Sequence, residues 1–219
     1  MKKYLAILKK CPLFYNINEE SLVRMLGCLG ARVESFDRKY TIFPEGMAAR
    51  YLGIVLSGSV QTVYMDYYGN RSILSESSVG EIFAESFACA EVESMPVSVV
   101  ANEPCEIMLI DCSHILHTCH NNCGHHQQLI YNLMKDLATK SIMFYRRIEV
   151  TSKRTTRDKL MAYLMMCAKS EGRSSFRIPF DRQELADYLE VDRSGLSAEI
   201  SKLRREGVIE NTKDVFKLL

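Results

Sequence analysis

Residues 180–207 read FDRQELADYLEVDRSGLSAEISKLRREG, and this stretch predicts two helices joined by a tight turn. Asp181 is a typical N-cap residue, and Glu184 completes a capping box with it. Asp192 caps the second helix, and Gly207 ends that helix after a basic last turn. Two capped helices with a link of about three residues form a helix-turn-helix.

The first turn of the second helix decides between two interpretations of this motif. An ordinary helix pair in a bundle would carry apolar residues there, whereas this helix carries Arg193, Ser194 and Ser197. A recognition helix presents such side chains to base edges in the major groove. We therefore predict double-stranded DNA as a partner. The predicted DNA-binding residues are Arg193, Ser194, Ser197, Arg182, Gln183 and Lys202.

Charge and composition agree with a DNA-binding protein that stays inside the cell. Of the 28 basic and 27 acidic residues in the chain, 14 and 11 lie within residues 151–219, so the positive excess is C-terminal. No segment approaches the roughly 18 apolar residues of a membrane helix, and the N-terminus lacks a signal-peptide cleavage site. We expect a cytoplasmic protein with no membrane partner, whose eight cysteines are reduced thiols.

The rest of the chain changes its hydrophobic period twice. Residues 31–111 contain short strand-like runs separated by turn signals, which predicts a β-sandwich or barrel. Residues 123–150 are helical without a break. After a polar stretch at residues 151–155, a helix and a short strand lead into the helix-turn-helix. A β-hairpin in residues 208–218 follows it, so the C-terminal unit is predicted to be a winged helix.

The long helix predicts a contact between two subunits. A stripe with a spacing of three and four residues consists of Ile130, Leu133, Leu137, Ser141, Phe144 and Ile148. A sustained stripe on a helix of this length is typical of a coiled-coil dimer interface. The alternative is that the same stripe packs on the β-structure of its own chain.

The order of these parts resembles the cyclic-AMP receptor protein/FNR (Crp/Fnr) family of bacterial transcription regulators. The resemblance rests on segments spread over nearly the whole chain, whose order and spacing together are specific. They are CPLF at 11–14, IFPEG at 42–46, IVLSGSV at 54–60, GEIFAE at 80–85, RQELA at 182–186, DRS at 192–194 and GVI at 207–209.

The resemblance implies an α+β fold in three parts. Residues 1–122 would form a double-stranded β-roll of the jelly-roll, cyclic-nucleotide-binding-like type with flanking helices. Residues 123–150 would form the dimerisation helix, and residues 151–219 the winged helix-turn-helix. A homodimer would bind a pseudo-palindromic operator and recruit or block RNA polymerase. A signal sensed by the β-roll would swing the DNA-binding domains about residues 150–154.

The effector pocket implied by the resemblance departs from that of cyclic-AMP binders. Its candidate residues are Gly80, Glu81, Phe83, Glu85, Met95 and Pro96. Glu85 stands where family members hold the ribose, but Met95-Pro96 replaces the Arg-Ser or Arg-Thr pair that holds the cyclic phosphate. Methionine carries no charge and proline has no N–H, so we expect an unidentified small effector other than cyclic AMP. The cofactor is unknown.

Two further departures concern the other branch of the family and the recognition helix. The oxygen-sensing branch holds an iron–sulfur cluster on N-terminal cysteines, whereas this region has only Cys11 and Cys28. Many relatives carry Ser-Arg where this chain has Ser197-Ala198, so we expect a different operator preference. Glu190 occupies the turn where glycine is usual, which requires a left-handed conformation or a looser turn.

Residues 105–126 contain all five histidines and several cysteines. Thiolates with imidazoles suit zinc, copper(I) or haem, so a metal, haem or thiol-redox sensor is one interpretation. Its candidate ligands are Cys112, His117, Cys119 and Cys123. The pattern matches no zinc-finger template, so the other interpretation is buried thiols and solvated histidines, with no metal.

The sequence also bears on two other classes of function. A cupin-like enzyme needs histidines projecting from the β-barrel, and residues 31–110 contain none, so no catalytic residues are predicted and the protein is not expected to be an enzyme. A DNA-binding dimer that needs no ligand stays open, because the phosphate site is degenerate.

Overall fold

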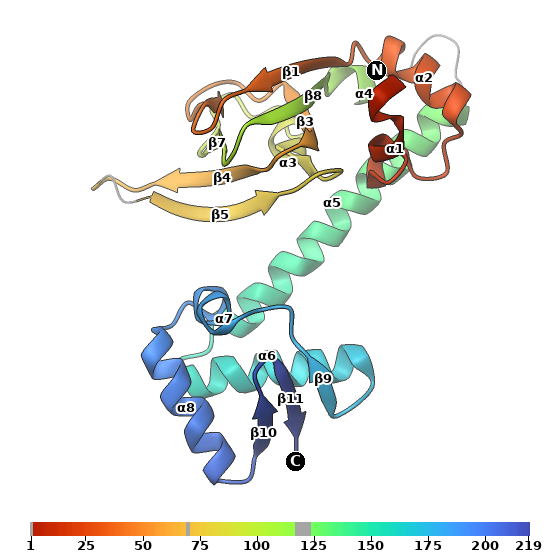
Figure 1. Cartoon of the computed structure of the whole chain (residues 1–219). Coiled ribbons are helices and arrows are strands. Elements are labelled where there is room, and N and C mark those ends of the chain that lie inside the picture. Colours follow the sequence, from red (N-terminus) through yellow and green to blue (C-terminus); the bar gives the residue numbers. More distant parts are fainter. Residues whose placement is uncertain (1, 69–70, 117–123) are drawn as a thin grey trace. The chain divides into compact units, whose positions relative to one another are not determined.

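The computed structural model describes residues 2–68, 71–116 and 124–219 (Figure 1). Contacts divide the chain into two compact units, Met1–Thr139 and Lys140–Leu219. The helices of the N-terminal unit are η1 (Lys2–Tyr4), α1 (Leu5–Leu8), η2 (Pro12–Phe14), α2 (Glu19–Cys28), α3 (Glu85–Cys89) and α4 (Ser113–Leu116). The helix α5 (Gly124–Thr151) begins in this unit and ends in the other, so the expected long helix is confirmed.

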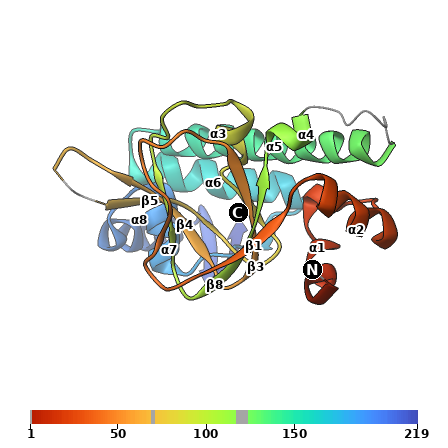
Figure 2. The ribbon, with the colours of Figure 1, turned by 90° about the horizontal axis from the view of Figure 1, so that it is seen from above.

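The strands of the N-terminal unit form a β-roll. They are β1 (Arg32–Phe36), β2 (Thr41–Phe43), β3 (Tyr51–Ser57), β4 (Val60–Met65), β5 (Arg71–Ser77), β6 (Ile82–Phe83), β7 (Ser98–Ala101) and β8 (Cys105–Asp111). Within the described residues they pair antiparallel in two sheets, β1-β8-β3-β6 and β2-β7-β4-β5. This is the jelly-roll order, which confirms the predicted fold class. Figure 2 shows α1 and α2 gathered at one end of the roll.

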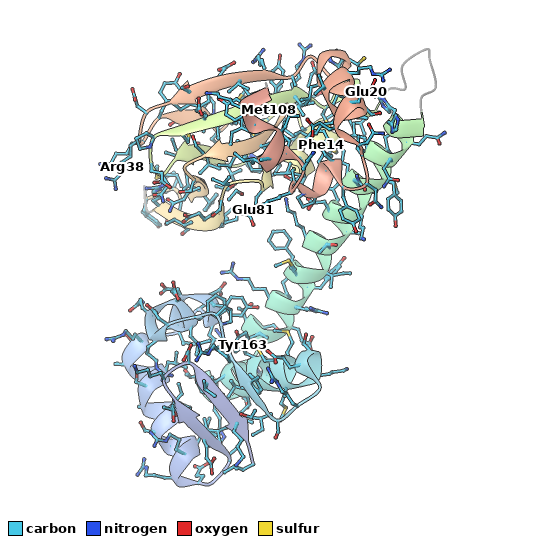
Figure 3. The ribbon with its side chains drawn as sticks, turned by 45° about the vertical axis from the view of Figure 1, so that its right-hand side comes forward. Phe14, Glu20, Arg38, Glu81, Met108 and Tyr163 are labelled. Carbon is cyan, nitrogen blue, oxygen red and sulfur yellow. The ribbon has the colours of Figure 1, made fainter. Side chains whose placement is uncertain are left out.

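The strands β3 and β8 are buried on both faces over most of their length, which explains the apolar runs at residues 52–56 and 107–110. Side chains alternate across a strand, so Val55 and Ile107 face the second sheet in the inter-sheet core. Leu52 and Met108 face the helices instead, in a helix-side core that also contains Phe14. Figure 3 labels Phe14 and Met108 in this region. The roll is therefore a central sheet covered by strands on one side and by helices on the other.

The start of α5 is part of the helix-side core. Leu133 is 2% exposed there, and Ile130 and Leu137 pack against the same cluster. Asn132 on the same helix donates hydrogen bonds to the carbonyls of Leu13 and Tyr15, at 2.9 and 2.7 Å. The first half of the stripe predicted for the dimer thus packs on its own chain. The second half is exposed, at Ser141, Phe144 and Ile148.

The C-terminal unit has the predicted winged-helix order. Its elements after α5 are α6 (Thr156–Glu171), β9 (Ser175–Arg177), α7 (Arg182–Leu189), α8 (Arg193–Arg205), β10 (Ile209–Thr212) and β11 (Val215–Leu218). The strands form a sheet in the order β10-β11-β9, and β10-β11 is the wing. The three helices and this sheet enclose a core of their own, which includes Leu160, Leu185, Leu196 and Phe216. Tyr163, labelled in Figure 3, belongs to this core.

The end of α5 is fastened to this C-terminal core. Val150 is buried in it. Arg147 lies 3.6 Å from the carboxylate of Glu190 and over the ring of Tyr188, 5.8 Å from its centroid. The last turns of α5 therefore belong to the C-terminal unit, although they precede the polar stretch expected to act as a hinge.

Candidate DNA interface and effector site

The helix α7, which precedes the turn to α8, is stabilised by interactions at both of its ends. Asp181 accepts a hydrogen bond from the Glu184 N–H, and the Glu184 side chain accepts from the Asp181 N–H, so the predicted capping box is confirmed. Glu190 ends α7 with φ 54° and ψ 55°, which is the left-handed conformation and not the looser turn, the two outcomes expected for it. Lys159 on α6 donates to the carbonyls of Leu189 and Glu190, at 3.1 and 3.2 Å. A cation at a helix C-terminus interacts favourably with the exposed carbonyls.

The N-terminus of α8 presents its polar side chains to solvent. Asp192 caps the helix by accepting from the Gly195 N–H at 2.8 Å, and Arg193 is exposed in the first turn. Ser194 donates its hydroxyl to the Asp192 carboxylate, and Ser197 donates to the Arg193 carbonyl at 2.9 Å. The two serine hydroxyl hydrogens are thus used within the helix, while the Arg193 guanidinium points to solvent as a donor.

Arg182 is a cation with an incomplete set of hydrogen bonds. It opens α7, and its buried guanidinium nitrogen Nη1 has no hydrogen-bond partner among the residues that the structure describes. Its pKa lies below the usual range for arginine because of burial and because of the charge of Arg193. A groove of about 640 Å³ adjoins Arg182 and is lined also by Arg177 of β9 and Lys213 of the wing, together with the carboxylates of Asp181, Glu184 and Asp214. An anion there would satisfy the nitrogen and offset the repulsion between the two arginines.

The other predicted DNA-binding residues lie on the same two helices. Gln183 is exposed on α7 and donates to Asp187 one turn later, at 2.8 Å. Lys202 is exposed in the last turn of α8, beside Arg204 and Arg205. Sequence reasoning missed Arg157, which binds Glu206 at 2.6 Å and Glu199 at 3.4 Å and so fastens α6 to α8. Its partners lie 42 and 49 positions away, beyond the reach of any local pattern.

The candidate effector pocket is filled by apolar side chains. Phe83 packs directly over Gly53, where a Cβ would lie 2.1 Å from the Phe83 ring, and its centroid is 5.8 Å from that of Phe43. Met95 is buried in the same inter-sheet core. The Met95 N–H donates to the carbonyl of Met47 at 2.9 Å, so this backbone donor is already used within the chain. The close approach of the Phe83 ring to the backbone leaves room only for a glycine at position 53.

The remaining pocket candidates lie around this core. Glu85 is buried at the start of α3, where it follows the left-handed residue Ala84, φ 60°. Glu81 is exposed and accepts from the Ser78 N–H at 2.7 Å, closing the turn that contains Gly80, φ 89°. Pro96 is exposed. The structure thus brings Phe83 and Met95 into one cluster and leaves Glu81 and Pro96 at the surface.

The cysteine and histidine cluster is described only in part. His117, Cys119 and Cys123 lie outside the described residues, and Cys112 is buried in the helix-side core. Within the described ranges, no group of three histidine, cysteine or acidic side chains is arranged to hold a metal ion. His126 is buried and donates from Nε2 to the carbonyl of Ile115 at 2.7 Å. Sequence reasoning missed Cys89, whose sulfur lies 3.3 Å from that of Cys112.

Two family models match this chain. One, described as a cyclic nucleotide-binding domain, matches residues 33–122. The other, described as a Crp-like helix-turn-helix domain, matches residues 158–219, which include α7, α8 and the wing. The chain belongs to the Crp/Fnr family. It is accordingly a DNA-binding transcription regulator, a class of protein that is generally not enzymatic.

Solved structures of Crp/Fnr regulators share this fold along nearly the whole chain. The catabolite activator protein of Thermus thermophilus is 21% identical with a TM-score of 0.51, covering 95% of this chain and 93% of that chain. The c-di-GMP responsive global regulator CLP of Xanthomonas campestris is 17% identical with a TM-score of 0.59, covering 92% and 99%. DNR of Pseudomonas aeruginosa is 19% identical with a TM-score of 0.52, covering 100% and 95%.

Neither a curated relative nor, within the described residues, a membrane-spanning helix was found. No curated protein sequence matches this chain. Among the helices that the structure describes, none is both long enough and apolar enough to cross a membrane.

Proposed function

We propose that this Crp/Fnr regulator binds DNA as a homodimer, with one α8 helix in each of two successive major grooves. The operator is then a pseudo-palindrome with half-site centres about 34 Å apart. The observation that carries this proposal is the pair of arginines at the start of α7 and α8. Arg193 is exposed where a recognition helix meets base edges, and Arg182 has a buried nitrogen that lacks a partner among the described residues.

We assign the two arginines different roles. Arg193 reads a base edge, since arginine bonding to guanine is the commonest specific contact in the major groove. Arg182 binds a backbone phosphate, which satisfies its buried nitrogen and offsets the charge of Arg193. Gln183, Ser194, Ser197 and Lys202 contribute further polar and phosphate contacts.

The dimer contact runs along an exposed stripe of α5, offset from the one that the sequence predicted. This stripe, the α5 seam, consists of Tyr131, Met134, Ala138, Ser141, Tyr145 and Ile148. Its spacing of three and four residues is that of a coiled coil. Tyr131, Met134, Tyr145 and Ile148 are 60, 65, 70 and 60% exposed, an unusual exposure for such large side chains. The buried Leu133 cannot contribute to this contact.

The β-roll senses a signal other than a cyclic nucleotide. A cyclic phosphate needs charged or N–H donors, and Met95-Pro96 supplies neither, because the Met95 N–H already bonds to Met47 and proline has no N–H. An effector that enters beside Phe83 and Glu85 would meet an apolar wall and one carboxyl group. Regulation then follows by recruiting or blocking RNA polymerase in the cytoplasm.

A selection from random duplex DNA with the purified protein tests the proposal. We expect a two-fold symmetric consensus with half-sites one helical turn apart. Enrichment of an asymmetric single site would contradict the homodimer. The absence of any enrichment, with metals and oxidants also tested, would contradict operator binding by α8.

Replacing Arg193 tests its role in reading a base. Arg193→Ala should weaken binding to the selected operator by about 1–3 kcal/mol and relax the preference at one base position of each half-site. Arg173→Ala, which removes an exposed arginine paired with Glu171 in the α6–β9 turn, is the matched control and should leave the consensus unchanged. Equal weakening of specific and non-specific DNA by Arg193→Ala would instead make Arg193 a phosphate contact.

A further inference from the structure

Two cysteines that are distant in sequence face each other inside the N-terminal unit. Cys89 is the last residue of α3 and is partly exposed, whereas Cys112 follows β8 and is 2% exposed. Their sulfur atoms are 3.3 Å apart and share a hydrogen bond. A disulfide bond is about 2.05 Å long, so the two sulfurs need to approach by only about 1.2 Å.

The two thiols have unequal reactivity. The pKa of Cys89 is lowered by its hydrogen bond with Cys112, and this effect outweighs burial and the nearby Glu85. The pKa of Cys112 is raised by the same contact and by its burial. The thiolate is the nucleophile in cysteine chemistry, and solvent reaches Cys89 more readily than Cys112. Cys89 is therefore the residue that meets an oxidant first, and Cys112 stands next to it as the second thiol.

We propose that Cys89 and Cys112 form a reversible disulfide when the protein meets a hydroperoxide such as hydrogen peroxide. The Cys89 thiolate attacks one peroxide oxygen, and the O–O bond breaks to give a sulfenic acid at Cys89 and hydroxide. The hydroxide takes up the proton that the thiol lost. The Cys112 sulfur then attacks the Cys89 sulfur, the S–O bond breaks, and a second water leaves with the Cys112 proton. Two thiols are oxidised, and one peroxide is reduced to two waters.

The bond would tie the effector pocket to the region that leads to the long helix. The helix α3 directly follows Phe83 and begins at Glu85. On the other side, the Cys112 carbonyl accepts from the N–H groups of Ile115 and Leu116 and so begins α4. The carbonyl of Ile115 in turn accepts from His126 of α5. An effect of the disulfide on DNA affinity rests on the proposed function, whereas formation of the bond does not.

Peptide mapping by mass spectrometry tests bond formation. Trypsin is unsuitable, because the sequence has no lysine or arginine between Arg71 and Lys135. Cleavage after glutamate releases Ser86–Glu91 with Cys89 alone, and cleavage after Glu106 and Leu116 separates Cys112 from the other cysteines. After peroxide treatment of the full chain, we expect these two peptides to be joined, and a dithiol reductant to release them.

Single substitutions identify the pair. Cys89→Ser and Cys112→Ala should each abolish the joined peptides, and Cys28→Ser, which removes an exposed cysteine on α2, should not. Circular dichroism checks that each variant is folded. If Cys112→Ala does not fold, Cys89→Ser still tests the pair, because Cys89 is only half-buried. A bond from Cys89 to Cys119 or Cys123, or oxidation of Cys89 to a sulfinic acid without a bond, overturns the proposal.

Operator titration before and after peroxide tests the regulatory role. We expect the operator affinity of the wild type and of Cys28→Ser to change at least about five-fold on oxidation, and that of Cys89→Ser to stay constant. A disulfide that forms without any change in affinity overturns the regulatory role. Failure to bind DNA in either redox state would refute the proposed function instead and leave the mapped bond standing.

Discussion

At the scale of single residues, Glu190 occupies a backbone conformation that suits glycine. Its φ of 54° lies in the left-handed region, which costs a non-glycine residue about 1–2 kcal/mol. Glu190→Gly and Glu190→Ala both remove the exposed ion pair with Arg147, so their difference isolates the backbone term. Glycine relieves this strain but loses more entropy on folding, so we expect the glycine variant to be the more stable of the two by a net amount of about 1 kcal/mol in urea unfolding.

Gly207 provides the matched control for this prediction. It follows α8 with φ 70°, and among the described residues no heavy atom outside its own chain neighbourhood lies within 4 Å of the place where a Cβ would stand. Gly207→Ala should therefore lower stability through backbone strain alone. Equal stability of the two Glu190 variants would mean that the turn relaxes at no cost.

Single residues also show which features can be predicted from the sequence and which cannot. The strained position of Glu190 could be predicted, because turn chemistry depends on neighbouring residues. The pairs Cys89–Cys112 and Arg157–Glu206 could not, since their members are brought together only by the packing of separate elements. The Arg182 nitrogen that lacks a partner among the described residues could not be predicted either, because a sequence shows a cation but not how deeply it is buried.

At the scale of elements, the start of α8 depends on an ionised Asp192. Its carboxylate accepts from the Ser194 hydroxyl and the Gly195 N–H, and both bonds lower its pKa. A folded-state pKa below the unfolded value of about 3.9 gives stability that is present above about pH 4 and lost as the pH falls through the folded value. The advantage of wild type over Asp192→Asn should therefore be larger at pH 7 than at pH 2.

Urea unfolding of both proteins at the two pH values measures this difference. Asparagine is also a good N-cap but does not titrate, so it isolates the charge from the cap. Asp192→Ala, which loses the acceptor altogether, should be less stable than Asp192→Asn at both values. An advantage of wild type that does not change with pH would show that the carboxylate charge contributes nothing to the helix.

The positions of helices and strands could be predicted from the sequence better than the way they pack. The helix caps and hydrophobic periods predict α5, α7 and α8 to within a residue or two, and the strand-like runs of residues 31–111 predict the β-roll. The orientation of α5 was harder, because Leu133 and Met134 are both apolar and adjacent in sequence. Only packing separates them, since Leu133 fits the helix-side core and Met134 is left exposed.

At the scale of the whole molecule, the α5 seam should decide whether the protein is a dimer. Met134→Glu places two like charges opposite each other in a coiled-coil contact, and we expect the dimer dissociation constant to rise at least ten-fold, or about 1.4 kcal/mol. Met143→Glu is the matched control, because Met143 is also exposed on α5 but lies on the opposite side of the helix from the seam. Analytical ultracentrifugation measures both.

Leu133→Ala separates this interface from the alternative one. A buried leucine costs about 2–5 kcal/mol when truncated, so the variant should unfold more readily while the fraction that is folded still dimerises. The reverse result, a stable monomer from Leu133→Ala and an intact dimer from Met134→Glu, would place the contact on the stripe of Ile130, Leu133 and Leu137. Operator binding follows the same equilibrium, because two half-sites about 34 Å apart can be occupied together only by two linked α8 helices. Met134→Glu should thus retain weak half-site binding and lose the preference for the symmetric operator.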